Sequence, residues 1–380
     1  MIETAEERQA LVEAVREFSD AELAPFAGER DAEKTFPVET LRAAGEMGLG
    51  GIYVGEEYGS GLSREDAVAI FEELAKGDTA VAAYISIHNM TAWMVDTFGN
   101  AEQRERWLPG LTSMRDLGSY CLTEPGAGSD AAAITTSARR EGDEYVVNGT
   151  KQFISGAGAS SVYIVMARTG EPGSRGISAL VVPGDAPGLS FGPDERKMGW
   201  NAQPTRQVVF EDVRVPVANR LAEEGDGFRI AMKGLNGGRV NMGACSLGGA
   251  QWALEKALAY VQERHAFGAP LSANQTVVFA LADMETELQA ARALLQRAAR
   301  KMDEGAADVA AACALAKRFA TDAAFEVANR ALQLHGGYGY LHEYGIERVV
   351  RDLRVHQILE GTNEIMRSIV GRSLLSGVPR

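Results

Sequence analysis

Hydrophobic residues in this 380-residue chain change their spacing twice, and this change constrains the fold more than any other feature. Up to about residue 117 they recur at helical spacing, as in the apolar stretch from Thr79 to Phe98. Short β-type runs between Gly- and Pro-rich turns follow, and helical spacing returns after about Ala222. The length allows two or three domains. We therefore expect an α+β multidomain chain with an N-terminal helical domain (1–117), a middle β domain (118–222) and a C-terminal helical bundle domain (223–380).

Local signals refine this division. Thr4 and Glu7 have the spacing of a capping box, Ser63 is a candidate N-cap, and a further helix fits Pro37 to Met47. Six runs predict strands of an antiparallel sandwich or barrel: SYCLT, ITTSARR, EYVVNGTKQFIS, SVYIVMAR, ISALVVP and RQVVFEDVRVP. Ala-rich helical stretches later in the chain favour a four-helix bundle, with helices over 226–264, 274–303, 307–335 and 361–376.

Charge and cysteine content limit the partners that we expect. The formal net charge is −14 and the sequence has no basic run, which argues against binding to nucleic acid or anionic lipid. No apolar stretch reaches the roughly 18 residues of a membrane span. The three cysteines form no CxxC pair and the histidines lack metal-ligand spacing, so we expect no disulfide and no metal site. The acidic N-terminus is unlike a signal peptide; we expect a cytoplasmic protein, or a mitochondrial matrix protein if the chain is a processed eukaryotic one.

The segment YCLTEPGAGSD, from Tyr120 to Asp130, is the most informative part of the middle domain. A strand leads into a turn with many backbone N–H donors, which lets a flat or phosphorylated ligand approach the main chain. GAGSDA also approximates the dinucleotide-binding G-x-G-x-x-A pattern, but that pattern requires a helix after the turn. The β-branched run that follows makes a Rossmann domain the weaker interpretation. A plain hairpin turn would explain Pro125 and the glycines, but not Thr123 and Ser129 together with the terminal aspartate.

Four further segments carry more glycines or polar groups than packing requires. FISG, from Phe153 to Gly156, ends a strand with an aromatic ring and a hydroxyl. GLNGGRVN, from Gly234 to Asn241, puts costly glycines in a helix, which a close helix crossing or a bound ligand would explain. QLHGGYGY, from Gln333 to Tyr340, contains three glycines, a glutamine and aromatic residues, which is more than a simple helix C-cap requires. QILEGTNEI, from Gln357 to Ile365, places Glu360 beside a glycine, where it could act as a base, although each segment alone is weak evidence.

Together and in this order, the segments resemble the acyl-CoA dehydrogenase family over essentially the whole chain. YCLTEPGAGSD resembles the flavin and acyl-CoA signature of the family, and QLHGGYGY and EGTNEI complete the pattern. The resemblance implies FAD as cofactor, an acyl-CoA as substrate, electron-transfer flavoprotein as electron acceptor and a homo-oligomer, commonly a tetramer. GWNAQPTR, GLNGGRVN and VRDLRVHQILEGTNEIMR look most like the branch that acts on isobutyryl-CoA in valine breakdown.

The resemblance also assigns site residues. It implies cofactor contacts for Tyr120, Cys121, Leu122, Thr123, Gly128, Ser129, Phe153, Ile154, Ser155, Arg264, Phe267, Gln275, Gln333, Leu334, Gly336, Gly337, Thr362, Asn363 and Glu364. It implies substrate contacts for Ser129, Asn236, Gly237, Gly238, Arg239, Gly361 and Arg372. Arg264, Gln275 and the segment from Gln333 to Gly337 match positions that reach the cofactor of a neighbouring subunit. Many relatives carry tryptophan and threonine where Phe153 and Ser155 stand, so we expect flavin binding with altered stacking.

Glu360 matches the catalytic base of the family. The implied reaction removes the α-proton of the acyl thioester while the β-hydrogen leaves as a hydride to the flavin, which yields an enoyl-CoA. The N–H of the base and a ribityl hydroxyl of FAD would stabilise the enolate that develops. A few branches place the base immediately before the residue that corresponds to Arg239. Gly238 occupies that position here, which favours Glu360.

Several alternatives stay open at this point. The acyl group could be 2-methylbutyryl or butyryl rather than isobutyryl, because sequence alone does not determine the volume of a pocket. An acyl-CoA oxidase would use the same chemistry with oxygen as the acceptor. A nucleic-acid-binding member of the same fold belongs to another class, and the net charge of −14 together with Glu360 argues against it. A nicotinamide-dependent Rossmann enzyme is the most distant alternative.

Overall fold

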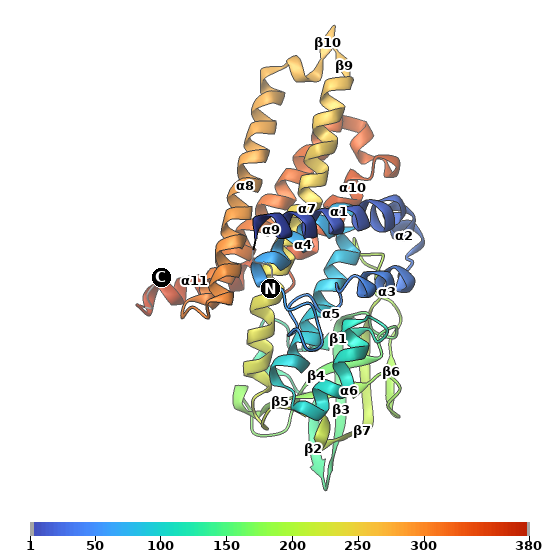
Figure 1. Cartoon of the computed structure of the whole chain (residues 1–380), viewed down its shortest axis with the longest axis vertical. Helices are drawn as coiled ribbons and strands as arrows, with labels where there is room; N and C mark the ends of the chain where they lie inside the picture. The colour runs from blue at the N-terminus through green and yellow to red at the C-terminus, as the bar shows by residue number, and fades with distance from the viewer. Residues whose placement is uncertain (1–3, 378–380) are drawn as a thin grey trace.

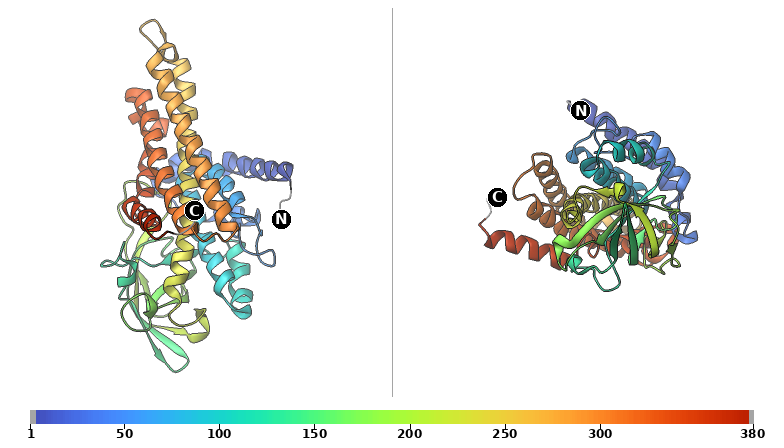
Figure 2. Two further views of the ribbon diagram at one scale, coloured as in Figure 1. Left: turned by 90° about the vertical axis from the view of Figure 1, so that its left-hand side faces the viewer. Right: turned by 90° about the horizontal axis from the view of Figure 1, so that it is seen from below.

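The computed structural model describes residues 4–377. The molecule is elongated, with a helical bundle towards one end and a β-sheet at the other, and α7 extends along both (Figure 1). The N-terminal helices lie on one side: α1 to α4 are at the level where bundle and sheet meet, and α5 and α6 extend down beside the sheet (Figures 1 and 2). These helices are α1 (Ala5–Phe18), α2 (Ala27–Glu33), α3 (Val38–Glu46), α4 (Arg64–Gly77), α5 (Thr79–Phe98) and α6 (Ala101–Thr112).

Side-chain caps begin several of these helices where the sequence predicts them. Thr4 and Glu7 form a reciprocal capping box at α1, and Ser63 forms one with Asp66 at α4. Asp78 caps α5, and most of this apolar helix is buried, as its composition predicts. No helix among residues 4–377 is both long and apolar enough to cross a membrane.

The middle-domain strands form one eight-stranded sheet within the described residues. The strands are β1 (Gly118–Cys121), β2 (Ser137–Glu141), β3 (Glu144–Ser155), β4 (Val162–Arg168), β5 (Ile177–Pro183), β6 (Leu189–Phe191), β7 (Thr205–Pro216) and β8 (Arg220–Leu221). Their order is β6-β7-β3-β2-β4-β5-β8, and β1 pairs with β4. β1 and β4 are parallel because the β2–β3 hairpin intervenes and the chain returns in the direction of β1. The predicted antiparallel pairing therefore holds for most strand pairs, but β4 pairs in parallel with β1 and, at Ser137 and Arg168, with β2.

The turn after β1 determines where β2 can begin. The run ITTSARR predicts a strand from Ile134, but β2 starts at Ser137. The carboxylate of Glu124 accepts hydrogen bonds from the main-chain N–H groups of Thr135 and Thr136, with N···O distances of 2.6 and 2.9 Å. These N–H groups are therefore not free to pair with another strand. Only a three-residue 3-10 turn, Ala131–Ala133, lies between GAGSDA and β2. A Rossmann βαβ unit is therefore excluded.

The C-terminal domain contains α7 (Gly227–Glu263), α8 (Gln275–Asp303), α9 (Val309–His335), α10 (Ile346–His356) and α11 (Asn363–Leu375). A small hairpin of β9 (His265–Ala266) and β10 (Ala269–Pro270) joins α7 to α8. The helices expected from periodicity correspond to α7, α8, α9 and α11. The expectation missed α10, which packs against α7 and α9 in the bundle, while α11 packs against α9.

Two glycines of α7 show how closely the bundle packs. A Cβ at Gly248 would lie 2.1 Å from the main-chain oxygen of Glu72 on α4. A Cβ at Gly243 would lie 2.4 Å from the side chain of Leu295 on α8. The first contact would require the main chain of α4 to move, and the second would displace the buried Leu295 side chain, so these glycines serve helix packing. The same helix carries Gly237 and Gly238, whose surroundings differ.

Candidate active site

Glu360 lies in the loop between α10 and α11, where the main chain is strained. Its φ is +56°, in the left-handed region, and Gly361 follows with φ +90°. The carboxylate oxygen Oε2 is buried and has no hydrogen-bond partner among residues 4–377. A Cβ at Gly238 would lie 2.5 Å from this oxygen, so the carboxylate rests against the main chain of α7. Buried polar atoms are normally paired, which makes this oxygen a candidate for contact with a ligand.

Two buried cations hold the main chain around Glu360. The Nε atom of Arg239, on α7, donates to the main-chain oxygen of Glu360 at 3.0 Å. The Nζ atom of Lys317, on α9, donates to the main-chain oxygen of Gly361 at 2.9 Å and to Oδ1 of Asn363 at 2.9 Å. The loop is therefore held by cations from two different helices.

Burial shifts the proton affinity of the groups at this loop. Burial raises the pKa of Glu360 to about 7, although the charges of Arg239 and Lys317 act in the opposite direction. Burial likewise lowers the pKa of Lys317 to about 8. The carboxyl of Glu360 can therefore take up or release a proton near neutral pH, which is the property that a general base requires.

Two tyrosines lie within electrostatic reach of Glu360. The hydroxyl of Tyr120, at the end of β1, is buried without a partner in the described part of the chain. Burial and then the charge of Glu360 raise the pKa of Tyr120 well above its usual value, and Arg239 opposes them. The hydroxyl of Tyr53 accepts a hydrogen bond from Nδ2 of Asn241 at 3.0 Å, and its pKa is also raised, chiefly by burial. The end of β1 therefore faces the loop that carries the carboxylate.

The two middle-domain segments predicted to bind a cofactor lie side by side. The main-chain N–H of Gln152 donates to the main-chain oxygen of Thr123 at 2.8 Å. The hydroxyl of Ser119 donates to the main-chain oxygen of Ser155 at 2.6 Å. Phe153 has φ +59° at a register shift between β3 and β7, and its side chain is 63% exposed. The bulge therefore turns this aromatic ring out of the sheet, next to the partly buried Ser155.

The remaining residues of these segments contribute in different ways. The side chains of Cys121, Leu122 and Ile154 are buried in the core, so only their main chain can contact a ligand. Ser129 is exposed. A Cβ at Gly128 would meet nothing within 4 Å, so the main chain of the turn is open on that side. An open glycine-rich main chain of this kind is suited to close approach of a phosphate or a flat ring.

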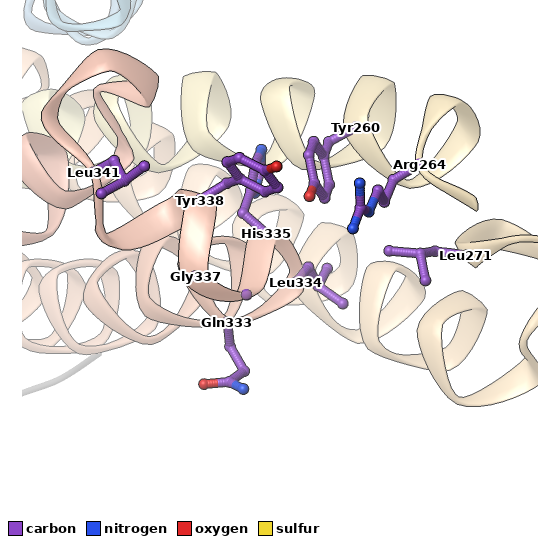
Figure 3. Close-up of a pocket in the computed structure, with 10 residues that line it drawn as sticks. Tyr260, Arg264, Leu271, Gln333, Leu334, His335, Gly337, Tyr338 and Leu341 are labelled. Atoms are coloured by element: carbon purple, nitrogen blue, oxygen red, sulfur yellow. The ribbon is translucent and has the colours of Figure 1, made fainter. Parts of the chain in front are cut away.

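A second group of predicted residues lies at the other end of the bundle. Arg264, Leu334 and Gly337 are among the residues that line a cavity of about 490 Å³; the full lining is Tyr260, Arg264, Leu271, Gln333, Leu334, His335, Gly336, Gly337, Tyr338 and Leu341. Figure 3 shows Arg264 beside the Tyr260, His335 and Tyr338 rings, with the side chain of Gln333 directed away from them. The guanidinium of Arg264 lies 5.5 Å from the Tyr338 ring centroid.

Two more predicted residues lie on the hairpin and helix that adjoin this cavity. Phe267 is fully exposed between β9 and β10 and has φ +55°, while Gln275 is exposed at the first turn of α8. The hairpin is at the end of the molecule that is farthest from the β-sheet (Figure 1). The structure therefore brings the predicted residues together in two groups rather than one.

The first group comprises Glu360 and the predicted residues at the ends of β1 and β3. Predicted residues on α7 and α11 complete it. Oδ1 of Asn236 accepts a hydrogen bond from Nη1 of Arg239 at 2.9 Å. The hydroxyl of Thr362 caps the N-terminus of α11. The Asn363 side chain accepts from Lys317 and donates to α9, so it holds α11 in place rather than facing a cavity. Glu364 and Arg372 are exposed on α11. Nothing in the described residues forms a metal-binding group of three or more His, Cys, Asp or Glu side chains.

Three buried residues of this region, Lys317, Tyr53 and Arg64, lie outside the motifs that the sequence indicates. Lys317 lies in an Ala-rich stretch of α9 that has no motif. Arg64 is buried with its guanidinium carbon 3.4 Å from the ring centroid of Tyr53, and a Cβ at Gly237 would lie 2.8 Å from Nη1 of Arg64. A lysine at a position that helical periodicity assigns to the buried face was the one available signal.

Comparisons with known proteins agree with this geometry. Models of the acyl-CoA dehydrogenase N-terminal, middle and C-terminal domains match residues 5–115, 119–213 and 225–375. A bovine protein named isobutyryl-CoA dehydrogenase, mitochondrial, is 52% identical over 372 residues, which cover 98% of this chain and 89% of the relative. The chain belongs to the acyl-CoA dehydrogenase family. The fold class expected from the sequence is thereby confirmed.

Further relatives of this acyl-CoA dehydrogenase share its full architecture. A protein of the same name from Dictyostelium discoideum is 53% identical over 360 residues, which cover 94% of this chain and 86% of the relative. The structure of butyryl-CoA dehydrogenase from Megasphaera elsdenii superimposes with a TM-score of 0.95 at 39% identity, over 99% of this chain and all of that chain. The chain is therefore an oxidoreductase in a family of flavoproteins that are generally FAD-dependent.

Proposed function

We propose that this acyl-CoA dehydrogenase uses FAD to oxidise a short branched acyl-CoA, with isobutyryl-CoA as substrate and methacrylyl-CoA as product. The observation that supports the reaction most strongly is the carboxylate of Glu360. It rests on the glycine main chain of α7, has an unpaired buried oxygen and has a pKa near 7. Two relatives with more than 50% identity, both named isobutyryl-CoA dehydrogenase, support the choice of acyl group.

The residues of the first group fit a flavin cofactor. An aromatic ring and a hydroxyl, from Phe153 and Ser155, stand at the end of β3 beside the open turn of Gly128 and Ser129. The unpaired hydroxyl of Tyr120 lies in the same region. We infer that these segments hold the flavin end of FAD. When bound, FAD would supply the acceptor for the β-hydrogen of the substrate, which leaves as a hydride.

The protein residues would act on the α-carbon of the thioester. Glu360 would take the α-proton on its unpaired carboxylate oxygen, and its raised pKa would make it a strong enough base near neutral pH. The main-chain N–H of Glu360 has no acceptor among residues 4–377. It is therefore available to donate to the thioester carbonyl and to stabilise the enolate that develops. Arg239 and Lys317 would fix the orientation of that N–H relative to the carboxylate, because they bind the main-chain oxygens of Glu360 and Gly361.

The second group of residues suggests how subunits share the cofactor. Arg264, Gln275 and the segment from Gln333 to Gly337 lie at the end of the molecule far from the sheet. We infer that they bind the adenosine diphosphate end of FAD held by a neighbouring copy, in a homo-oligomer that we expect to be a tetramer. Electron-transfer flavoprotein would be the electron acceptor, with access beside the exposed ring of Phe153. We propose a cytoplasmic location, or the mitochondrial matrix in a eukaryote.

Turnover of a panel of acyl-CoAs with a dye acceptor tests this function. The panel contains butyryl-, isobutyryl-, 2-methylbutyryl-, isovaleryl- and octanoyl-CoA, each measured as kcat/KM on the FAD-loaded protein. We expect the highest kcat/KM for isobutyryl-CoA. A higher value for butyryl- or 2-methylbutyryl-CoA would reassign the acyl group. Peroxide formed at the full rate without dye would instead identify an oxidase.

A further inference from the structure

A lysine on α9 is buried without the partner that such a residue usually has. Lys317 has no solvent-exposed surface, and no carboxylate among residues 4–377 lies within ion-pair distance of its Nζ atom. Its two hydrogen-bond acceptors are neutral oxygens, of Gly361 and Asn363. Burying a charge without an opposite charge in contact is costly. The charges that favour the protonated form of Lys317 are those of Glu360, Asp322 and Glu364, and none of them is in direct contact with Nζ.

That loop holds Glu360 in a conformation that non-glycine residues rarely adopt. Glu360 has φ +56° and Gly361 has φ +90°. Strained main-chain conformations persist only where the surroundings enforce them. Arg239 binds the main-chain oxygen of Glu360 from α7, and Lys317 binds the next main-chain oxygen from α9. The two contacts fix consecutive peptide units and with them the direction of the Glu360 side chain.

We propose that Lys317 is a positioning residue for Glu360: from α9 it holds the strained loop through the main-chain oxygen of Gly361. The chemical importance of this role rests on the proposed function, in which Glu360 is the base. The structural part of the role does not, because it concerns only the orientation and ionisation of Glu360. A residue whose sole task was to attach α11 to α9 would bind Asn363 but need not contact Gly361.

The surroundings of both groups are consistent with this role. The charge of Lys317 lowers the pKa of Glu360 against the larger effect of burial, and the charge of Glu360 raises that of Lys317. The other titratable or charged groups that act on one or both are Arg239 on α7, Tyr120 on β1, Tyr53 after α3, Asp322 on α9, His356 on α10 and Glu364 on α11. Of these, only Arg239 also lowers the pKa of Glu360, so Lys317 supplies one of two stabilising charges.

Infrared titration of the FAD-loaded protein measures the pKa of Glu360 directly and without turnover. The protonated carboxyl band of Glu360 is the one that the Glu360→Gln variant lacks, and its midpoint pH gives the pKa. Lys317→Gln retains an N–H donor for Gly361 but removes the charge. We expect its midpoint to rise by about one pH unit, because an opposite charge nearby favours the ionised acid. Lys317→Arg retains the charge, and we expect its midpoint to stay near that of the wild-type protein.

A matched control separates this effect from general destabilisation. Lys301→Met removes a partly buried lysine that is paired with Asp308 near the start of α9, and no interaction links Lys301 to Glu360 among the described residues. We expect lower thermal stability in this variant and an unchanged Glu360 midpoint. If Lys317→Gln does not fold, the comparison of Lys317→Arg with Lys317→Met still tests the charge.

The outcomes distinguish the two proposals. An unchanged midpoint in Lys317→Gln, or an equal rise in Lys301→Met, would overturn the role of Lys317. A wild-type protein that binds FAD but does not oxidise any acyl-CoA would refute the proposed function instead. In that case the infrared midpoints still decide whether Lys317 controls the ionisation of Glu360.

Discussion

Gly238 lacks a side chain at the one place where the carboxylate of Glu360 needs the space. A Cβ there would lie 2.5 Å from one carboxylate oxygen and 2.9 Å from the other. The neighbouring Gly237 faces Nη1 of Arg64 instead, at 2.8 Å. Arg64 can shift the end of a flexible side chain, whereas Glu360 cannot move without losing its position as a base. The two adjacent glycines therefore differ in what they permit.

Gly238→Ala should displace the Glu360 carboxylate and lower kcat by roughly 100-fold, because misplacement of a catalytic group by about 1 Å can cost that much. The FAD content should not change, since Gly238 is not part of the flavin segments. Steady-state kinetics of the FAD-loaded variant checks this. Gly237→Ala is the matched control and should lose much less activity. Equal losses in the two variants would contradict the different roles of these glycines.

At the scale of residues, the sequence points to groups that lie in local motifs, and their roles at the site stay predictions. Glu360 and the residues flanking it were predicted because they are adjacent in the chain to a recognisable segment. Lys317, Arg64 and Tyr53 belong to no motif, because their contacts form only through packing between segments that are distant in the chain: Lys317 contacts Gly361, and Arg64 lies over Tyr53. A buried charge on an otherwise apolar helix face leaves little trace in periodicity. Such residues become interpretable only when their partners are known.

At the scale of elements, one ion pair links the two segments predicted to hold the flavin. Lys151, on β3 and fully buried, donates to the main-chain oxygen of Leu122 at 3.0 Å and to Glu124 at 2.8 Å. Burial raises the pKa of Glu124, but Lys151 and nearby donors outweigh it and bring this pKa down to about 2. The same carboxylate accepts hydrogen bonds from the main-chain N–H groups of Thr135 and Thr136. The turn after β1 and the end of β3 are therefore fixed relative to each other.

Lys151→Met should destabilise the protein by roughly 3–5 kcal/mol, because it leaves a buried carboxylate without its counter-charge. It should also reduce FAD retention, since the turn at Leu122 loses its anchor. Thermal unfolding and the flavin-to-protein absorbance ratio measure both effects. The double variant Lys151→Met/Glu124→Gln should recover part of the stability. A double variant as unstable as the sum of the two single variants would contradict the coupling of this pair.

The elements also show where periodicity succeeds and where it fails. α7, α8 and α9 were predicted to within a few residues, because long apolar faces and clear ends define them. α10 was missed although Ile346, Val349 and Leu353 are buried at helical spacing. The sequence analysis assigns no element to this segment, in which charged residues stand between the buried ones. The late start of β2 was equally unpredictable, since it depends on the distant carboxylate of Glu124.

At the scale of the whole molecule, the predicted cofactor residues form two separate groups, of which one lies near the end of the molecule that carries β9 and β10 (Figure 1). The first surrounds Glu360 and the ends of β1 and β3, and the second lines the cavity at Arg264 and Gly337. The hairpin of β9 and β10 is far from the sheet along the long axis of the molecule (Figure 1 and the left panel of Figure 2). A complete binding site for an extended dinucleotide is thus expected to need more than one copy of the chain.

Arg264→Ala should therefore weaken FAD retention and oligomer assembly together. Flavin content after gel filtration and the molar mass from light scattering test both at once. Arg300→Ala removes an exposed arginine that pairs with Glu65 at 3.0 Å, and this control should change neither quantity. Unchanged flavin content and unchanged mass in Arg264→Ala would count against a cofactor site shared between subunits.

The most direct test of the account is anaerobic reduction of the bound flavin by isobutyryl-CoA in wild-type protein and in Glu360→Gln at equal FAD content. The wild-type flavin absorbance should bleach within the time of one turnover. The rate in the variant should fall by roughly 100- to 10,000-fold, the usual contribution of a general base. Bleaching of the variant at the wild-type rate would show that another group removes the α-proton.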